Sequence, residues 1–196
     1  MYLKSLALVS VLAVTAQSAT AQEVGETSVG GGITTFGLAL QGEYSIAPNM
    51  GARAMIMGGI NANDTIEVDD YTVDGDLELG GLAAFFDYYP LANAWRISGG
   101  LMLSNSELSG DFVGPELFTG TIALTNDVAP VITTGFKTSI APGWSFSGDV
   151  GVVISSLEAS TDSNDPAVQD EIDTLNDDLS DVPVLPYAGI AISYSF

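Results

Sequence analysis

The final segment of the chain, residues 187–196, alternates strictly between apolar and small residues. Ile190, Ile192 and Tyr194 fall on one face of an extended strand, whereas glycine, alanine and serine fall on the other. The segment ends on an aromatic residue, Phe196. Strands of outer-membrane barrels alternate in this way, with apolar side chains toward lipid and aromatic residues at the membrane interface. The segment therefore predicts a strand that faces hydrocarbon on one side.

The same period of two recurs along the chain between segments rich in turn residues. Eight strands are expected, at 23–32, 36–47, 51–60, 77–89, 95–104, 130–140, 144–155 and 187–196. Short turns alternate with three long connections, and an even number of strands closes the ladder without an edge, as hydrocarbon requires. We therefore predict an all-β fold: an eight-stranded antiparallel up-and-down transmembrane β-barrel with long acidic extracellular loops, one of which carries a short helix. The alternative is a soluble periplasmic β-sandwich, whose water-facing apolar side would aggregate.

The N-terminus has the features of a signal peptide. Lys4 gives a positive charge, residues 6–16 are apolar but too short to span a bilayer, and residues 19–21 form an A-x-A cleavage site. We expect residues 1–21 to be removed and residues 22–196 to form the outer-membrane barrel domain in a Gram-negative cell. The alternative is an uncleaved membrane anchor, but no stop-transfer pattern follows.

The chain is strongly acidic, with 25 acids against 4 bases and a formal net charge of −21. This charge excludes nucleic acid as a partner, because the phosphate backbone would repel it. The chain has no cysteine, so no disulfide stabilises the exported fold. The expected partners are outer-membrane lipid and lipopolysaccharide, together with the barrel-assembly machinery, which would bind the C-terminal strand ending at Phe196.

Several segments resemble a known family of proteins. They are Phe86-Asp-Tyr-Tyr-Pro-Leu-Ala-Asn93, Arg96-Ile-Ser-Gly-Gly-Leu-Met102, Glu107-Leu-Ser-Gly110, Trp144-Ser-Phe-Ser-Gly-Asp-Val-Gly151 and the closing strand. The chain resembles the small eight-stranded outer-membrane barrels of the OmpA-transmembrane, OmpX and OmpW kind, and most closely an uncharacterised proteobacterial outer-membrane β-barrel group. The resemblance implies the barrel and its location, and it implies no biochemical reaction.

Six charged side chains point inward in the predicted register, one acid and one base in each short hairpin. The pairs are Glu43 with Arg53, Asp87 with Arg96, and Lys137 with Asp149. Partners on adjacent strands near a turn can meet directly or diagonally. We therefore expect a neutral ion-pair layer that closes the bore near its periplasmic end. This layer either plugs or gates the bore, or is purely structural because an unpaired charge inside a narrow barrel is costly.

The three long connections hold 20 of the 25 acids and none of the bases. Ca²⁺ and Mg²⁺ take oxygen ligands, and the candidate ligands are Asp70, Asp74, Asp76, Asp162 and Asp165. Neither segment matches an EF-hand loop. The alternative is a solvated acidic surface that salt screens. No cofactor is expected apart from loosely bound Ca²⁺ or Mg²⁺.

The last long connection contains one expected helix. Asp165 suits the N-cap and Pro166 suits the first helical position. An apolar stripe at helical spacing follows, formed by Val168, Ile172, Leu175 and Leu179. The helix either folds as a lid onto neighbouring apolar residues or presents the stripe to another protein. The receiving residues of the lid would be Leu108, Phe112, Leu117 and Phe118.

The absence of histidine limits the function of the chain. It excludes a histidine general base and a Ser–His nucleophile, so we expect no enzyme. A structural or surface-interaction barrel with a closed bore is the first expectation. A narrow porin-like channel for ions or small, even apolar, solutes is the alternative. Small inward residues predict a wet cavity above the ion-pair layer and favour that alternative: Gly59, Gly81, Ala83, Ser98, Gly100, Gly135 and Gly151.

Overall fold

The computed structural model describes residues 23–68, 71–114, 117–126, 128–181 and 183–196. The expected signal peptide and its cleavage site lie outside these residues. Within the described part of the chain, no helix is long and apolar enough to cross a lipid bilayer.

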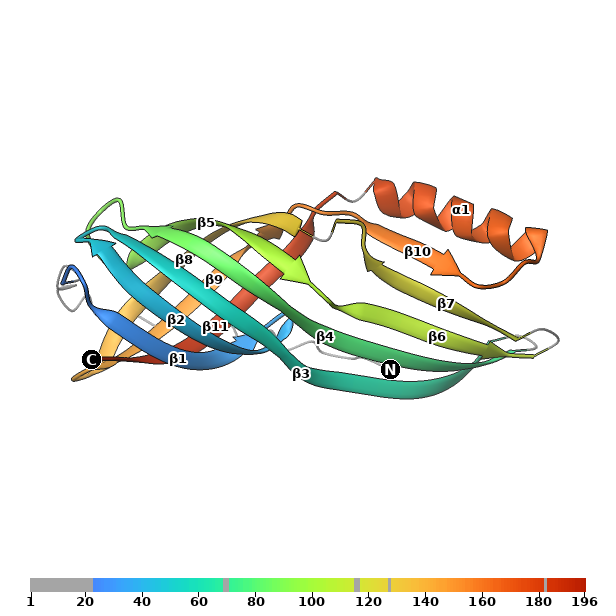
Figure 1. The fold of residues 1–196 in the computed structure, drawn as a ribbon, viewed down its shortest axis with the longest axis horizontal. Helices are drawn as coiled ribbons and strands as arrows, with labels where there is room; N and C mark the ends of the chain where they lie inside the picture. Colours follow the sequence, from blue (N-terminus) through green and yellow to red (C-terminus); the bar gives the residue numbers. More distant parts are fainter. Residues whose placement is uncertain (1–22, 69–70, 115–116, 127, 182) are drawn as a thin grey trace, which may run out of the picture.

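Eight antiparallel strands close into a barrel, as predicted. They are β1 (Thr27–Thr34), β2 (Gly37–Ala47), β3 (Met50–Val68), β4 (Tyr71–Tyr88), β5 (Trp95–Ser104), β8 (Val128–Ala141), β9 (Trp144–Val153) and β11 (Leu185–Ser195). Each strand pairs with the next one in this series, and β1 pairs with β11 from Ser28 to Thr34, which closes the ladder (Figure 1). The period of two in the sequence thus corresponds to side chains that point alternately into and out of the barrel.

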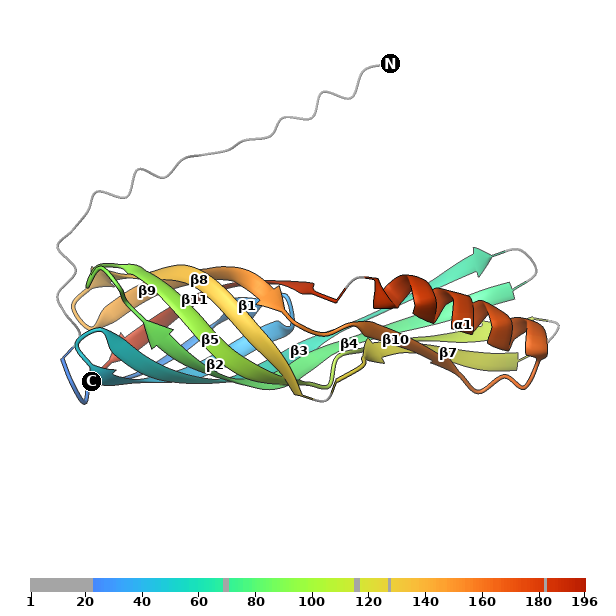
Figure 2. The ribbon, with the colours of Figure 1, turned by 90° about the horizontal axis from the view of Figure 1, so that it is seen from above.

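A second sheet region projects from one end of the barrel (Figures 1 and 2). Strands β3 and β4 are 19 and 18 residues long, and their outer halves continue beyond the barrel. Three more strands, β6 (Glu107–Val113), β7 (Leu117–Leu124) and β10 (Leu157–Thr161), add to β4 in the order β3-β4-β6-β7-β10. We call this region the extension. It comprises β3 from Ile60, β4 as far as Leu79, β6, β7, β10 and the helix described below.

The prediction of three long irregular loops was therefore wrong over much of their length. The acids are dense there, but they occupy alternate positions: Asp76 and Leu77, for example, point to opposite faces of β4. The pairing of β3 with β4 shifts register between Met57 and Ile60, where Gly59 has a φ of 74°. Such a bulge displaces the alternation by one residue, which hides the continuation of the strand in the sequence.

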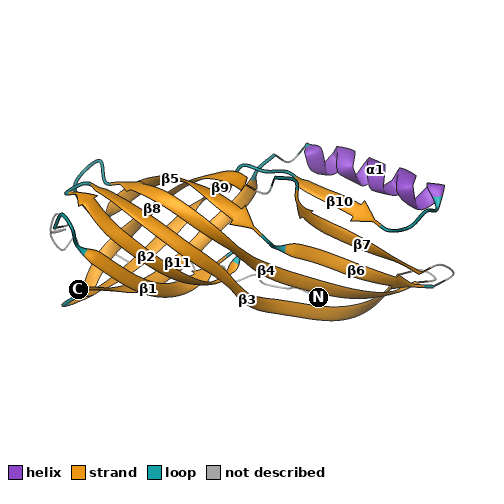
Figure 3. Ribbon diagram, viewed as in Figure 1, coloured by secondary structure: helices purple, strands orange, loops and turns teal. Residues whose placement is uncertain are grey.

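The predicted helix is confirmed as α1 (Pro166–Ser180). Asp165 is its N-cap, and the backbone N–H of Ala167 donates to Asp165 Oδ1 at 2.8 Å. This bond satisfies one of the free N–H groups at the start of the helix. Both views show α1 lying along β10 (Figures 1 and 2). Figure 3 shows that α1 is the helical part of an otherwise β molecule.

Candidate functional site

Four buried charges form one cluster inside the barrel. Arg53 contacts Asp87 and Asp149 at 3.1 Å each, through separate guanidinium nitrogens. Arg96 contacts Asp149 at 2.6 Å and Asp87 at 3.5 Å. All four side chains are almost inaccessible to solvent. Two cations and two anions cancel, so the cluster buries charge without leaving any of it uncompensated.

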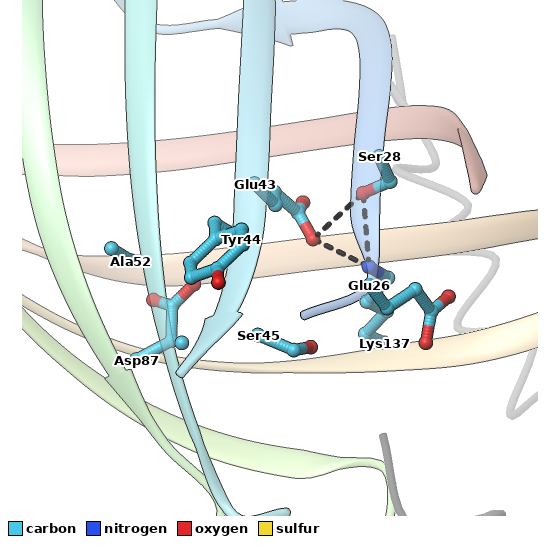
Figure 4. Close-up of a pocket in the computed structure, with 9 residues that line it drawn as sticks. Glu26, Ser28, Glu43, Tyr44, Ser45, Ala52, Asp87 and Lys137 are labelled. Carbon is cyan, nitrogen blue, oxygen red and sulfur yellow. Dashed lines mark hydrogen bonds and ion pairs between the residues drawn. The ribbon is translucent and has the colours of Figure 1, made fainter. Parts of the chain in front are cut away.

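A second ion pair inside the barrel is more exposed than the four-charge cluster. Lys137 Nζ contacts Glu43 Oε2, and Lys137 Nζ also donates to Ser28 Oγ at 3.4 Å (Figure 4). Gln41 Nε2 donates to the other carboxylate oxygen of Glu43 at 2.8 Å. A small hollow leads to this pair, and Asp87 of the four-charge cluster also lines it. The hollow therefore ends at the charged layers.

The six predicted residues all lie inside the barrel, and one of the three predicted hairpin pairs is confirmed, because Arg96 contacts Asp87 at 3.5 Å. The other two predicted pairs, Glu43 with Arg53 and Lys137 with Asp149, were wrong. Glu43 and Arg53 are directly opposite in the β2–β3 register, yet the guanidinium of Arg53 reaches Asp87 and Asp149. Glu43 instead binds Lys137, which lies across the bore on β8. The long side chains of arginine and lysine span the narrow interior, and each arginine gains two carboxylates by doing so. Pairing in this barrel is thus set across the bore as well as along hairpins.

An apolar cluster fills the bore beyond the four-charge cluster. Met55 and Phe85 are the inward residues that follow Arg53 and Asp87 along β3 and β4, away from the short turns. The members are Phe36, Ala39, Met55, Met57, Ala83, Phe85, Met102, Ala129, Val131, Val153 and Tyr187. We call this cluster the apolar plug. Its side chains are at most 7% exposed, so water is excluded from this part of the bore.

The expected wet cavity above the ion-pair layer was therefore wrong. The inward glycines accommodate neighbouring groups instead of leaving space. A Cβ added at Gly100 would lie 2.2 Å from the carbonyl oxygen of Ala84 and 2.8 Å from the ring of Phe85. A Cβ at Gly135 would lie 2.4 Å from a carboxylate oxygen of Asp149. Gly59 lies in the β3 bulge and is exposed.

The outside of the barrel is apolar. Residues that alternate with the buried ones are exposed, and they include Leu40 (68%), Ile56 (62%) and Val150 (59%). Among the described residues, the aromatic side chains of this outer surface lie toward the short turns: Tyr44, Phe86, Tyr88, Trp95, Phe136, Trp144, Phe146, Tyr194 and Phe196. The barrel is thus inverted relative to a water-soluble protein, with charged side chains inside and apolar side chains outside.

The extension has one apolar and one acidic face. The inner face is the one that continues the barrel interior. Val73 of β4 pairs with Phe112 of β6, which pairs with Phe118 of β7, so all three side chains lie on this face. The rings of Phe112 and Phe118 stack at 4.5 Å. On the outer face, Asp74 pairs with Asp111, and Glu78 pairs with Glu107. Several of the acids predicted to lie in loops therefore line one face of a sheet.

The candidate metal ligands are separated and engaged elsewhere. Asp74 accepts a hydrogen bond from the hydroxyl of Thr65 at 2.7 Å, Asp162 accepts one from the backbone N–H of Thr119 at 2.6 Å, and Asp165 caps α1. Asp76 is exposed on the outer face of β4, and Asp70 lies outside the described residues. In the part of the chain that the structure describes, no three potential ligands gather around one point. A Ca²⁺ or Mg²⁺ site at these residues stays a prediction.

The apolar stripe of α1 faces β10. Val168, Ile172 and Leu179 are half-buried, whereas Leu175 is 37% exposed. The helix packs against β10, and two of the expected receiving residues, Leu108 and Leu117, are 45% and 77% exposed. The expected lid therefore lies along the side of the extension.

Sequence reasoning missed the contact that fixes α1 in place. The side-chain amide of Asn176 donates to the carbonyl of Ala159 at 2.9 Å, and its carbonyl accepts from the N–H of Ala159 at 2.7 Å. Asn176 thus takes the place of a neighbouring strand at the outer edge of β10. A single asparagine in a polar helix gives no sequence signal for this role.

Comparison with known proteins shows the fold alone. No family model matches the chain, and no curated protein matches it. The crystal structure of Acinetobacter baumannii CarO2 aligns with a TM-score of 0.63 and 14% identity, covering 89% of this chain and 100% of the other. Acinetobacter baumannii CarO aligns with a TM-score of 0.60 and 14% identity, covering 89% and 98%. The chain therefore shares its barrel fold with these proteins, and kinship with the OmpA, OmpX and OmpW barrels stays a prediction.

Proposed function

We propose that the protein is an integral outer-membrane barrel of the structural or surface-interaction type. The inverted distribution of side chains carries this proposal, because a closed barrel with buried charges and an exposed apolar surface is stable only in hydrocarbon. The closed ladder also leaves the barrel without an unpaired strand edge in the lipid. The absence of histidine and cysteine agrees with a role other than catalysis.

In this proposal the short turns face the periplasm and the extension faces outside the cell. Short periplasmic turns and long outer connections are the rule for such barrels. The aromatic residues near the turns would then lie at the periplasmic interface, where their amphipathic rings are favourable. Lipid and lipopolysaccharide would surround the barrel, and the assembly machinery would bind its C-terminal strand. Export would require the signal peptide predicted at residues 1–21.

The filled bore supports a closed barrel over a porin-like channel. A solute entering from the turns would meet the Lys137–Glu43 pair and the four-charge cluster, and then the apolar plug. An ion would have to separate buried salt bridges and then cross an apolar region, and both steps are costly. The narrow channel remains the alternative that a conductance measurement tests.

Reconstitution of the mature chain tests the proposal. Refolded protein should insert into lipid vesicles, migrate differently in electrophoresis before and after heating, and give no steady conductance in a planar bilayer. The double variant Phe85→Ala with Arg96→Ala, which removes parts of both barriers, should conduct and so shows that the assay detects a leak. Steady conductance by the unaltered protein would support the channel, and solubility of the folded chain without detergent would overturn the membrane location.

A further inference from the structure

The extension sheet has two edges, and the described residues cover only one of them. At the β10 edge, α1 packs against the strand and Asn176 occupies the backbone groups of Ala159. At the opposite edge, the pairing of β3 with β2 ends at Leu38 and Gly58, and β3 continues to Val68 paired with β4 alone. Figure 1 shows β3 and α1 at opposite margins of the extension. We call residues 60–67 of β3 the free edge.

Backbone groups of the free edge point away from the sheet. The N–H of Thr65 donates to Asp64 Oδ1 at 2.9 Å, so this N–H lies outside the β3–β4 ladder. Groups that point to one side of a strand recur every second residue. The backbone N–H and C=O groups of Asn61, Asn63 and Glu67 therefore point to the same side as those of Thr65. A row of such groups is a template for the addition of another strand.

The two faces of the extension define which strand would fit. Every second side chain of an added strand would lie beside the outer face, next to Glu67 and near Asp74, Asp76 and Glu78 of β4. The intervening side chains would lie beside the inner face, next to Ile60, Ala62 and Asp64. The three bases among the described residues all lie inside the barrel, so nothing in the extension neutralises its acids.

We propose that the free edge of β3 binds an extended segment of a cationic partner by strand addition, with basic and apolar residues alternating along that segment. Glu67 on the outer face is the acid of the free edge that a basic side chain of the partner can pair with. The inward carboxylate of Asp64 must leave the N–H of Thr65 when a strand adds. A charge of this kind on an edge strand disfavours neutral strands. A second copy of this chain fits poorly, since edge-to-edge pairing would place two acidic faces side by side.

This inference specifies the kind of partner that the proposed surface protein would bind. It rests on the proposed function in one respect, namely that the extension lies outside the cell. Binding is measured on the purified, refolded mature chain in detergent, whereas the membrane proposal is tested in vesicles. Failure of one is therefore distinguishable from failure of the other.

The test uses a short peptide of alternating lysine and valine, titrated at low salt and followed by calorimetry. The variant Asn63→Pro removes a backbone N–H from the free edge and leaves the β3–β4 ladder intact, because proline is tolerated at an edge whose N–H faces solvent. Asn63→Ala is the matched control, since it removes the same side chain and keeps the N–H. We expect Asn63→Pro to bind the peptide at least ~10-fold more weakly than Asn63→Ala. Proline removes the main-chain hydrogen bond at position 63 and disturbs the neighbouring bonds to the added strand.

Two comparisons complete the test. A peptide of the same composition with its lysines in one block should bind more weakly, because its side chains do not match both faces. A peptide in which threonine replaces lysine should bind the unaltered chain more weakly, and Glu67→Gln should reduce this difference. Equal binding of the block peptide, equal binding by Asn63→Pro and Asn63→Ala, or no binding of any peptide would overturn strand addition. Dimerisation that Asn63→Pro abolishes, without peptide binding, would assign the free edge to a second copy.

Discussion

Adjacent glycines on β5 have opposite surroundings. Gly100 points into the barrel, where an added Cβ would approach the backbone of Ala84 and the ring of Phe85. Gly99 points outward, and an added Cβ there meets nothing within 4 Å. The inward glycine is therefore needed for the close fit of the apolar plug, whereas the outward one is not.

Alanine substitutions at these two positions should separate packing from backbone effects. Gly100→Ala is expected to lower the free energy of unfolding by about 1–3 kcal/mol, because overpacking forces neighbouring groups to move. Gly99→Ala should leave it unchanged or slightly higher, since alanine restricts the unfolded chain. Urea titration in detergent measures both, and equal effects would show that the inward contact is unimportant.

Arg96 tests whether the four charges act as one unit. Arg96→Met leaves two buried carboxylates with only Arg53 between them, and about 3–5 kcal/mol of stability should be lost. Adding Asp149→Asn restores a neutral pair of Arg53 with Asp87, so the double variant should be more stable than the sum of the single losses predicts. Unfolding midpoints of the two single variants and the double variant complete the cycle. Additive losses would mean that the contacts are independent.

At the scale of elements, α1 stabilises an edge of the sheet more than it builds a core. None of its residues is fully buried, and its specific attachment is the pair of bonds between Asn176 and Ala159. An uncovered strand edge invites unwanted pairing, and a helix laid along the edge is one way to prevent it. The helix and the strand therefore depend on each other.

Asn176→Ala should detach the helix without unfolding it. Alanine favours the helical state, but the two bonds to β10 are lost. Amide exchange at Ala159 should become ~10-fold faster, as expected for the loss of about 1–2 kcal/mol of local stability. Exchange at Met55 inside the barrel should not change. Asp173→Ala, at an exposed position on the same helix, is the control and should leave Ala159 protected.

The sequence predicted the barrel well because membrane strands follow a strict period of two, and that period fixes which residues face inward. It predicted the contact of Asp87 with Arg96 but not the other pairs, because the reach of Arg53 across the bore depends on strands far apart in the chain. The bulge at Gly59 concealed the extension, since it breaks the alternation just where the acids begin. The role of Asn176 could not be predicted for a different reason, because its partners are backbone groups that carry no sequence signal.

At the scale of the whole molecule, the proposed orientation can be tested with the cysteine-free chain. Leu117→Cys places one thiol at the far end of the extension, where the native side chain is 77% exposed. Asn93→Cys places one in the turn between β4 and β5, which is exposed at the opposite end of the barrel. A membrane-impermeant maleimide should label the first on intact cells and the second only after the outer membrane is permeabilised. The reverse pattern would invert the proposed orientation.

Strands β3 and β4 run from the short turns to the far end of the extension with pairing that shifts only at the bulge. A pull on a partner held at the extension would act along these strands, at right angles to the hydrogen bonds that join them. Many bonds would then share the load in shear, instead of breaking one after another as in a peeled ribbon. A partner bound at that end would therefore be connected to the barrel by a stiff two-stranded segment and not by a flexible linker.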